Sequence, residues 1–345
     1  MALFARRSPE RAPLDGVDVV LADLDGVVYA GDGALPHAVE SLNLSRPGRR
    51  IGYITNNASR TDVSVAAHLS ALGLATAPTD VVTSPQAAVR LLTDRVAAGS
   101  TVLVVGGDGL VDELQKAGFV VTRSSADDPA AVVQGFAPEV GWTQLAEASY
   151  ALALPEEEGG IPWIATNTDW TIPQARGIAP GNGTLVSAVH TAVGRLATVA
   201  GKPEVPIFDE AVARFAAQHP LFLGDRLDTD ILGANRAGIP SALVLTGIDR
   251  PKHVLAAPAG SQPTYILRDL RELHVPYPHA VVSDGVVTVR GAKVRVDGAD
   301  VRILAEGDDP VDLLRAGAKA IWDTGRAIYG FRVPERLYAD PFRRP

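Results

Sequence analysis

Short runs of consecutive apolar residues alternate along this chain with stretches in which apolar residues recur every three to four positions. The runs are typical of strands buried on both faces, and the stretches are typical of helices with one apolar face. Strands are predicted over Val17–Ala22, Ile51–Thr55, Thr101–Val105, Ile161–Thr166, Leu221–Leu223 and Ala242–Thr246. Helices are predicted over Thr61–Leu72, Pro85–Ala97, Gly109–Ala117, Leu185–Leu196, Pro206–Gln218 and Thr229–Ala237. This alternation favours an α/β fold with parallel sheets.

Two acidic motifs stand directly after predicted strands, where ligands bind in folds of this kind. Asp23-Leu-Asp-Gly26 follows the first strand, and Gly224-Asp-Arg-Leu-Asp-Thr-Asp230 follows the strand at Leu221–Leu223. Carboxylate sets without nitrogen or sulfur donors suit Mg²⁺. The simpler alternatives are a turn for the first motif and an acidic helix N-terminus for the second. The two motifs by themselves leave both alternatives open.

Polar residues follow two further apolar runs. Thr55-Asn-Asn57 comes after the second strand and offers a hydroxyl and amides to phosphate oxygens, although Thr and Asn are also favoured helix N-caps. Lys202 follows the weak run Leu196–Ala200, between Gly201 and Pro203. A lone lysine is usually a solvated charge, but these two neighbours fix the backbone and leave it no helix face to decorate.

Composition removes several classes of protein and of site. The 345 residues carry a net charge of −8, whereas proteins that track nucleic-acid phosphates are usually basic. There is no cysteine, which excludes disulfides, zinc–thiolate sites and a cysteine nucleophile. No run is long and apolar enough to span a membrane, and Met1–Pro13 lacks the apolar stretch of a signal peptide. We therefore expect a cytoplasmic protein with neither nucleic acid nor membrane as partner.

The order of these motifs resembles the haloacid dehalogenase superfamily, in its class IIA, NagD-like branch. Asp-x-Asp, Thr, Lys and Gly-Asp-x-x-x-x-Asp follow one another here, each after an apolar run. The resemblance covers about residues 14–274. Its further matches are Gly26-Val-Val-Tyr29, Thr55-Asn-Asn-Ala-Ser-Arg60, Gly183, Gly201-Lys-Pro203 and Gly224-Asp-Arg-Leu-x-Thr-Asp-Ile231.

The resemblance implies a Mg²⁺-dependent phosphomonoester hydrolase. Asp23 would be the nucleophile that forms an aspartyl-phosphate, and Asp25 the general acid and base. The metal would be held by the Asp23 side chain, the Asp25 backbone carbonyl and Asp225. Asp230 would complete the acidic site beside Gly224, either by binding a metal-bound water or by orienting Lys202.

The phosphate-binding residues also follow from the resemblance. Thr55 and Lys202 would bind the oxygens of the transferring phosphoryl group. The backbone amides of Asn56 and Asn57 would help them, since phosphoryl transfer depends mainly on positioning and charge stabilisation.

The same resemblance implies a domain organisation. A Rossmann-like catalytic core would be discontinuous, over residues 14–82 and 181–274, with a cap domain inserted at 83–180. Within the cap, Asn167-Thr-Asp169 stands where many relatives have Asn-Pro-Asp, and Gly106-Gly-Asp-Gly109 reads as a strand-to-helix turn that either binds an anion or serves close packing. The branch often dimerises through its cap, so a homodimer is one open state.

Residues 277–345 form a small α+β extension that resembles a fragment of a GNAT-type acetyltransferase. Strands are predicted over Ala280–Val282, Val286–Val289 and Val294–Val296, and a helix over Pro310–Ala327. The extension lacks the acetyl-CoA-binding loop, so acetyl transfer is not expected, and packing or regulation is its predicted role.

The substrate would be a small phosphorylated metabolite. With its extension, the whole pattern resembles the actinobacterial-type glycerol 3-phosphate phosphatases, which implies a place in glycerophospholipid catabolism or glycerol recycling. Pyridoxal 5′-phosphate and nucleoside monophosphates are the alternative substrates. A non-hydrolytic phosphoryl-binding or signalling module is the alternative from another class of protein, and sustained turnover would exclude it.

Overall fold

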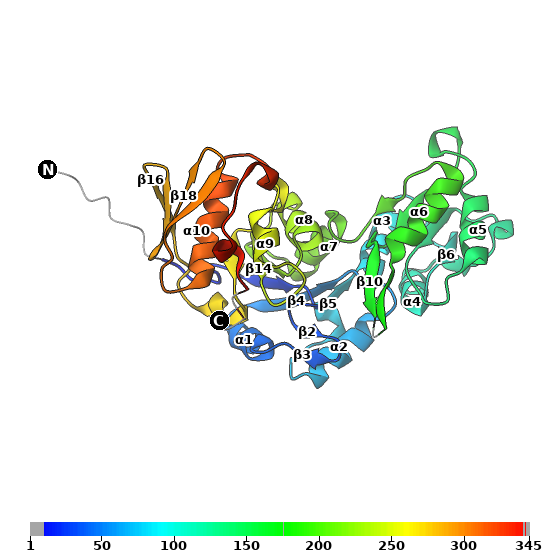
Figure 1. Cartoon of the computed structure of the whole chain (residues 1–345). Coiled ribbons are helices and arrows are strands. Elements are labelled where there is room, and N and C mark those ends of the chain that lie inside the picture. Colours follow the sequence, from blue (N-terminus) through cyan, green and yellow to red (C-terminus); the bar gives the residue numbers. More distant parts are fainter. Residues whose placement is uncertain (1–9, 175, 341, 343–345) are drawn as a thin grey trace. The chain divides into compact units, whose positions relative to one another are not determined.

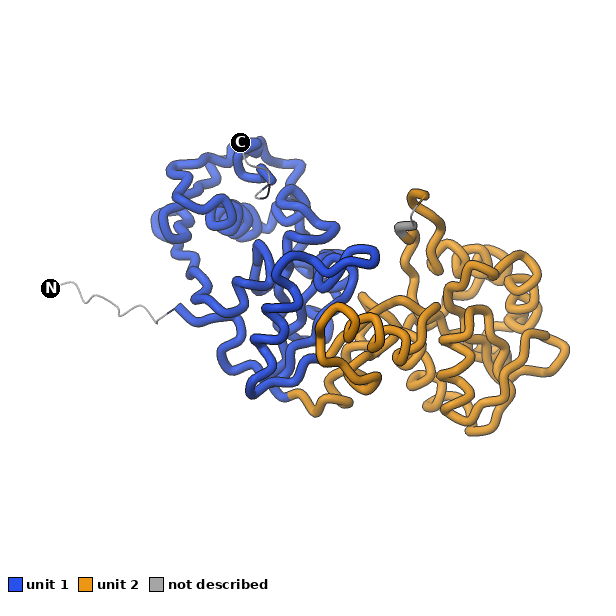
Figure 2. The backbone as a smooth tube through the Cα atoms, turned by 90° about the horizontal axis from the view of Figure 1, so that it is seen from below, with its two compact units in different colours: residues 1–51, 218–345 blue, residues 52–217 orange. Residues whose placement is uncertain are grey.

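The computed structural model describes residues 10–174, 176–340 and 342 (Figure 1). Most of the Met1–Pro13 segment, in which no signal peptide was predicted, therefore lies outside the described residues. The chain divides into two compact units: residues 1–51 with 218–345, and residues 52–217 (Figure 2). It passes from the first unit to the second within strand β4 (Arg50–Thr55).

A parallel sheet forms the centre of the first unit. Its strands β1 (Val19–Ala22), β13 (Pro220–Gly224), β14 (Ser241–Val244) and β15 (Tyr265–Leu267) pair in the order β15-β14-β13-β1. All residues of β1 and β14 are buried, as expected of strands covered on both faces. The three predicted strands of this unit and its parallel pairing are thereby confirmed, whereas β15 was not predicted.

Shorter elements complete this part of the first unit. Strands β2 (Tyr29–Ala30) and β3 (Gly33–Ala34) form a hairpin after the first acidic motif. A π-helical turn (Leu227–Ile231) leads into α8 (Leu232–Arg236) where a helix was predicted over Thr229–Ala237. The remaining helices are α1 (Ala38–Ser45) and α9 (Pro251–Leu255).

The C-terminal extension is an antiparallel sheet covered by one helix. Strands β16 (Ala280–Ser283), β17 (Val286–Val289), β18 (Ala292–Asp297) and β19 (Asp300–Ala305) pair in sequence, and α10 (Pro310–Trp322) packs against them (Figure 1). The helix predicted to reach Ala327 was too long: Gly325 adopts a φ of +66°, which ends rather than continues a helix. One hydrophobic core joins α10 and this sheet to β14, β15 and α9.

Arg315 of α10 ties the extension to the parallel sheet. The side chain is 6% exposed. Its Nε and Nη2 donate to the carbonyl oxygen of Ile266, in β15, over 3.0 and 2.6 Å. Its guanidinium also bonds Asp312 at 2.7 Å and Glu272 at 2.5 Å, and lies 4.7 Å from the ring centroid of Tyr277. Removing this one cation would leave two carboxylates without their common partner.

We expect Arg315→Ala to lower the free energy of unfolding by about 3–5 kcal/mol, the cost of breaking a buried ion pair by removing one partner. Arg302→Ala is the matched control, because the Arg302 side chain is 59% exposed and pairs with Asp297 at the surface. It is expected to cost less than about 1 kcal/mol. Urea denaturation measures both changes, and equal losses in the two variants would contradict this role of Arg315.

The second unit contains a pair of parallel strands and a separate parallel sheet. Strand β4 pairs with β5 (Val81–Thr83). The separate sheet has the order β12-β9-β8-β6-β7, in which every pairing is parallel. Its strands are β6 (Thr101–Val105), β7 (Val120–Thr122), β8 (Ala131–Gln134), β9 (Trp163–Ala165) and β12 (Thr198–Val199). The parallel α/β fold expected from the alternating pattern is therefore found in both units.

Helices of the second unit match the predicted ones within a few residues. They are α2 (Asp62–Ala71), α3 (Ser84–Thr93), α4 (Asp108–Lys116), α6 (Asn182–Val193) and α7 (Pro206–Phe215), joined by the unpredicted α5 (Trp142–Ala151). A hairpin of β10 (Thr171–Gln174) and β11 (Gly177–Pro180) precedes α6. The predicted cap at residues 83–180 remains a prediction.

Within the described residues, none of the helices combines the length and the apolar character that a membrane crossing requires.

Candidate active site

Three carboxylates meet at the carboxyl edge of the sheet in the first unit. Strands β1 and β13 are parallel neighbours with Ala22 opposite Leu223, so the residues that follow both strands emerge at the same edge. Asp23, Asp225 and Asp230 each place one carboxylate oxygen there, and these oxygens all lie within 4.8 Å of one another. Two acidic motifs about 200 residues apart in the sequence thus form one cluster.

The Asp225 carboxylate occupies a space that exists only because glycines stand on either side of it. Its side chain is 1% exposed, and its Oδ2 accepts a hydrogen bond from the Ile248 amide at 2.6 Å. A Cβ on Gly26 or on Gly247 would overlap the Asp225 carboxylate. Gly26 also has a φ of +82°, so the glycine of the first motif is required twice.

On the metal-binding role that the resemblance implies for Asp225, we expect Gly247→Ala to lower kcat/KM by about 10²-fold, because the added methyl group must displace the Asp225 carboxylate and small displacements at an active site have effects of that size. Gly33→Ala is the matched control, since a Cβ at Gly33 meets nothing within 4 Å. Phosphate-release kinetics on both variants measure the difference. Near-wild-type kinetics of Gly247→Ala would contradict the assignment of Asp225.

Asp230 holds the backbone that carries Asp225. Its Oδ2 accepts hydrogen bonds from the amides of Asp225 and Arg226, both at 3.1 Å. A Cβ on Gly224 would overlap the Asp230 side chain, which explains the glycine before the second motif. Both donors precede the π-helical turn that contains Asp230. Single π-helical turns are often found at functional sites. The alternative of a simple acidic helix cap therefore does not describe Asp230.

The other two aspartates of the motifs are more accessible. Asp25 is exposed, and the turn that follows it is closed by a hydrogen bond of 2.9 Å from the Gly26 amide to the Tyr29 carbonyl. Asp228 has a side chain that is 68% exposed and pairs with Arg226 at 2.8 Å. Asp228 thus stands apart from the three clustered carboxylates.

The loop after β14 belongs to this site, and the sequence interpretation overlooked it. Thr246 Oγ1 donates to the Gly26 carbonyl at 2.8 Å, and the Asp249 amide donates to the Asp225 carbonyl at 3.1 Å. The Asp249 carboxylate accepts from the Leu227 amide at 2.5 Å, while burial raises the pKa of this carboxyl group. The strand-end rule that selected Asp23 and Asp225, applied to Ala242–Thr246, would have found this loop.

A polar loop follows β4 in the second unit. Thr55 is buried at the end of that strand, and its Oγ1 accepts the Asn57 amide at 3.1 Å. The Asn57 side chain accepts from Ser59 at 2.7 and 2.9 Å. The N-cap of α2 is Thr61, whose Oγ1 accepts the Ser64 amide. The helix-cap alternative for Thr55–Asn57 is therefore excluded.

Lys202 lies against this loop. It is 4% exposed, so the solvated-charge alternative does not apply. Its amide donates to Asn56 Oδ1 at 2.8 Å, and its carbonyl accepts from Asn56 Nδ2 at 3.0 Å. The peptide bond between Lys202 and Pro203 is cis. Two motifs separated by 146 residues are thus bonded directly to each other within the second unit.

Turns at the ends of the second sheet also touch the Thr55 loop. Asn167 Nδ2 donates to the Asn56 carbonyl at 2.8 Å. A Cβ on Gly109 would lie 3.1 Å from the carbonyl oxygens of Ala58 and Arg60. Close packing therefore accounts for the glycine-rich Gly106–Gly109 turn, and carbonyl groups rather than an open anion site face the start of α4.

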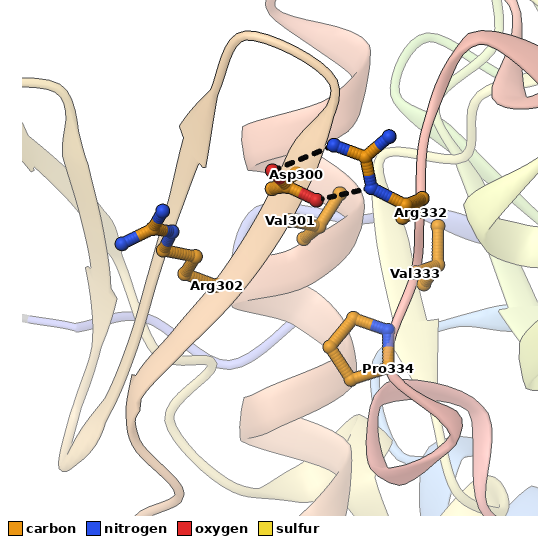
Figure 3. A pocket seen from close by; sticks show the side chains of 6 residues that line it. All are labelled: Asp300, Val301, Arg302, Arg332, Val333 and Pro334. Carbon is orange, nitrogen blue, oxygen red and sulfur yellow. Dashed lines mark hydrogen bonds and ion pairs between the residues drawn. The ribbon is translucent and has the colours of Figure 1, made fainter.

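A shallow pocket of about 580 Å³ lies elsewhere, on the C-terminal extension (Figure 3). It is lined by residues of β19 and of the segment Arg332–Pro334. Asp300 and Arg332 bond each other there at 2.5 and 2.8 Å, and Figure 3 shows Arg302 pointing away from them. None of the sequence-predicted site residues lines it.

Comparisons with known proteins show the family of this chain. A family model described as haloacid dehalogenase-like hydrolase matches residues 20–120, and a second model of that kind matches residues 199–273. The D-glycerol 3-phosphate phosphatase of Mycobacterium tuberculosis is 42% identical over 330 residues, covering 93% of this chain and 90% of the relative. The glycerol-3-phosphate phosphatase of Gallus gallus is 37% identical over 71% of this chain and 84% of its own length.

Solved structures give the same grouping. A glycerol phosphate phosphatase from Mycobacterium tuberculosis in complex with magnesium superimposes with a TM-score of 0.84 at 40% identity, covering 94% of this chain and 95% of that one. NagD from Escherichia coli K-12 superimposes with a TM-score of 0.66 at 29% identity, over 74% of this chain and 97% of its own.

Proposed function

Since this chain belongs to the haloacid dehalogenase-like hydrolases, as a phosphatase of their NagD-like branch, we propose that its substrate is glycerol 3-phosphate. One observation carries the choice of substrate. The similarity to the mycobacterial D-glycerol 3-phosphate phosphatase extends over 93% of the chain and therefore into the C-terminal extension. The glycerol-3-phosphate phosphatase of Gallus gallus matches 71% of the chain at 37% identity, whereas chronophins and acid sugar phosphatases match 72–74% of it at 32–35% identity.

The acidic cluster has the donor set that Mg²⁺ prefers. Three carboxylates converge within 4.8 Å, and the glycines at 26 and 247 leave the space that Asp225 occupies. The side chains of Asp23 and Asp225 and the backbone carbonyl of Asp25 would hold the cation. When bound, Mg²⁺ would offset the repulsion between the anionic nucleophile and the anionic phosphate.

Hydrolysis would proceed in two displacements at phosphorus. A carboxylate oxygen of Asp23 forms a bond to phosphorus while the bond from phosphorus to the glycerol oxygen breaks, and Asp25 gives its proton to that oxygen. Asp25, now a carboxylate, takes a proton from the water that attacks the aspartyl-phosphate, which releases phosphate and restores Asp23. Asp23 is 9% exposed and Asp25 is exposed to solvent.

The second unit would supply the groups that bind the phosphoryl oxygens. Thr55 and the Lys202 ammonium bind them, with the backbone of Asn56 and Asn57 shaping the loop. We propose that these residues and the acidic cluster serve one reaction, and that residues 83–180 act as the cap that excludes water. The hydrogen bond from Asn167 to the Asn56 carbonyl supports a cap that touches the phosphate-binding loop.

Initial rates of Mg²⁺-dependent phosphate release test the proposed substrate. The panel contains glycerol 3-phosphate, pyridoxal 5′-phosphate, nucleoside monophosphates and hexose phosphates. We expect the highest kcat/KM with glycerol 3-phosphate. A higher value with pyridoxal phosphate or a nucleotide would overturn the substrate, and no turnover of any ester would favour a phosphoryl-binding module. A homodimer and a cytoplasmic location remain predictions from the sequence.

A further inference from the structure

We infer that Asn56 is a positioning residue: its side-chain amide fixes Lys202 against the Thr55 loop and ties both to the turn at Asn167–Asp169. This inference rests on the proposed function and deepens it, because the family motif alone gives Asn56 only a backbone role. The argument stands on contacts within the second unit.

The first observation is that the Asn56 side chain makes two hydrogen bonds to the backbone of Lys202. Asn56 Oδ1 accepts the Lys202 amide at 2.8 Å, and Asn56 Nδ2 donates to the Lys202 carbonyl at 3.0 Å. One side chain therefore binds both polar groups of the Lys202 backbone. Two bonds fix the position and the orientation of the Lys202 Cα, from which the ammonium-bearing chain extends.

The second observation is the lack of space around this pairing. A Cβ on Gly201 would lie 2.6 Å from Asn56 Oδ1 and 2.5 Å from the Thr166 carbonyl. Real Cβ contacts are longer, so any larger residue would push the Asn56 amide away. The glycine in Gly201-Lys-Pro203 is thereby explained by the Asn56 side chain together with the Thr166 carbonyl.

The third observation concerns the remaining donor of the amide. Asn56 Nδ2 lies 3.2 Å from both carboxylate oxygens of Asp169. Because this nitrogen faces acceptors from Lys202 and from Asp169, the amide can be assigned in one orientation only, with Oδ1 toward the Lys202 amide. A bond to an ionised acceptor is also stronger than a neutral one.

The backbone of Asn56 is held as firmly as its side chain. Its carbonyl accepts from Ser84 Oγ and from Asn167 Nδ2, each at 2.8 Å. The side-chain atoms of Asn56 are thus engaged within the protein and point to Lys202 and Asp169. These side-chain atoms therefore affect the bound phosphate through the position of Lys202 and not by contacting the substrate themselves.

A double-mutant cycle tests the inference, measured as kcat/KM on the best substrate of the panel and as affinity for inorganic phosphate. Asn56→Ala is expected to lower kcat/KM by about 10²-fold, because it releases the Lys202 backbone. In a Lys202→Ala background the same substitution is expected to change kcat/KM by less than about twofold, because coupled residues are not additive. A residue that only stabilises the fold would cause equal losses in both backgrounds, and that result would overturn the inference.

Two further variants keep the test decisive. Asp169→Ala removes one partner of the Asn56 amide. It is expected to lower kcat/KM less than Asn56→Ala does, and to cause no loss of kcat/KM in the Lys202→Ala background. If Asn56→Ala does not fold, the cycle of Asp169→Ala with Lys202→Ala replaces it. Asn235→Ala is the matched control, because the Asn235 side chain makes three hydrogen bonds to Gly260, Gln262 and Ser241 and should affect stability without changing kcat/KM.

Failure of the proposed function would look different. A wild-type chain that hydrolyses no ester would overturn the phosphatase assignment of the site, while phosphate affinity would still decide the role of Asn56. The inference is supported if Asn56→Ala weakens phosphate binding in the otherwise wild-type chain and causes no further weakening in the Lys202→Ala variant. Unchanged phosphate binding by Asn56→Ala would overturn it.

Discussion

Asp23→Asn is expected to lower kcat for glycerol 3-phosphate by about 10⁴- to 10⁶-fold, the range seen when a catalytic nucleophile or its activating partner is removed. An amide oxygen does not attack phosphorus as a carboxylate does, and the substitution also removes one of the three charges that converge within 4.8 Å. Phosphate release under saturating substrate and Mg²⁺ measures the loss.

The control for this prediction makes the same chemical change at another aspartate of the motifs. Asp228→Asn alters a side chain that is 68% exposed and paired with Arg226, so its kcat is expected to stay within about twofold of wild type. If Asp23→Asn kept a tenth of the wild-type kcat, another residue would have to be the nucleophile.

Removal of divalent cations is expected to stop turnover and to lower the melting temperature, with Mg²⁺ restoring both. Without a cation the three clustered carboxylates repel one another, whereas a ligand that binds the folded state stabilises it by mass action. Calorimetry over a Mg²⁺ titration measures the shift in Tm separately from activity.

Asp225→Asn provides the comparison for the metal prediction. The amide keeps the shape that fits between Gly26 and Gly247 but removes the charge, so the Mg²⁺-dependent rise in Tm should shrink. Full activity in the presence of a chelator, or an undiminished rise in Tm in Asp225→Asn, would contradict a metal site at these carboxylates.

Local sequence patterns predicted the strands that carry the acidic cluster. The apolar runs that end at Ala22 and Leu223 are typical of strands buried on both faces of a parallel sheet. The strand ends drew attention to Asp23 and Asp225 separately, and the resemblance to the family implied that the two belong to one site. Strands as short as β15 (Tyr265–Leu267) and β8 (Ala131–Gln134) were missed, because three or four residues carry little periodic signal.

Contacts between distant segments could not be predicted from local patterns. Asn56 and Lys202 were each selected as a phosphate ligand, yet nothing in either motif indicates that the amide of one binds the backbone of the other across 146 positions. Gly247 is similar, since its glycine is explained only by the Asp225 carboxylate that approaches it. The roles of such residues can be recognised only in the folded structure, where their contact partners are known.

The central claim is that Asp23 carries the phosphoryl group during turnover. Asp25→Asn incubated with p-nitrophenyl phosphate tests it, because this leaving group needs no proton while hydrolysis of the intermediate still needs Asp25 as base. Acid-quenched enzyme is analysed by peptide mass spectrometry. The mechanism predicts one phosphoryl group on Asp23 and none in an Asp23→Asn, Asp25→Asn double variant. A phosphoryl group on another residue, or repeated release of p-nitrophenolate with unmodified Asp23 throughout, would contradict it.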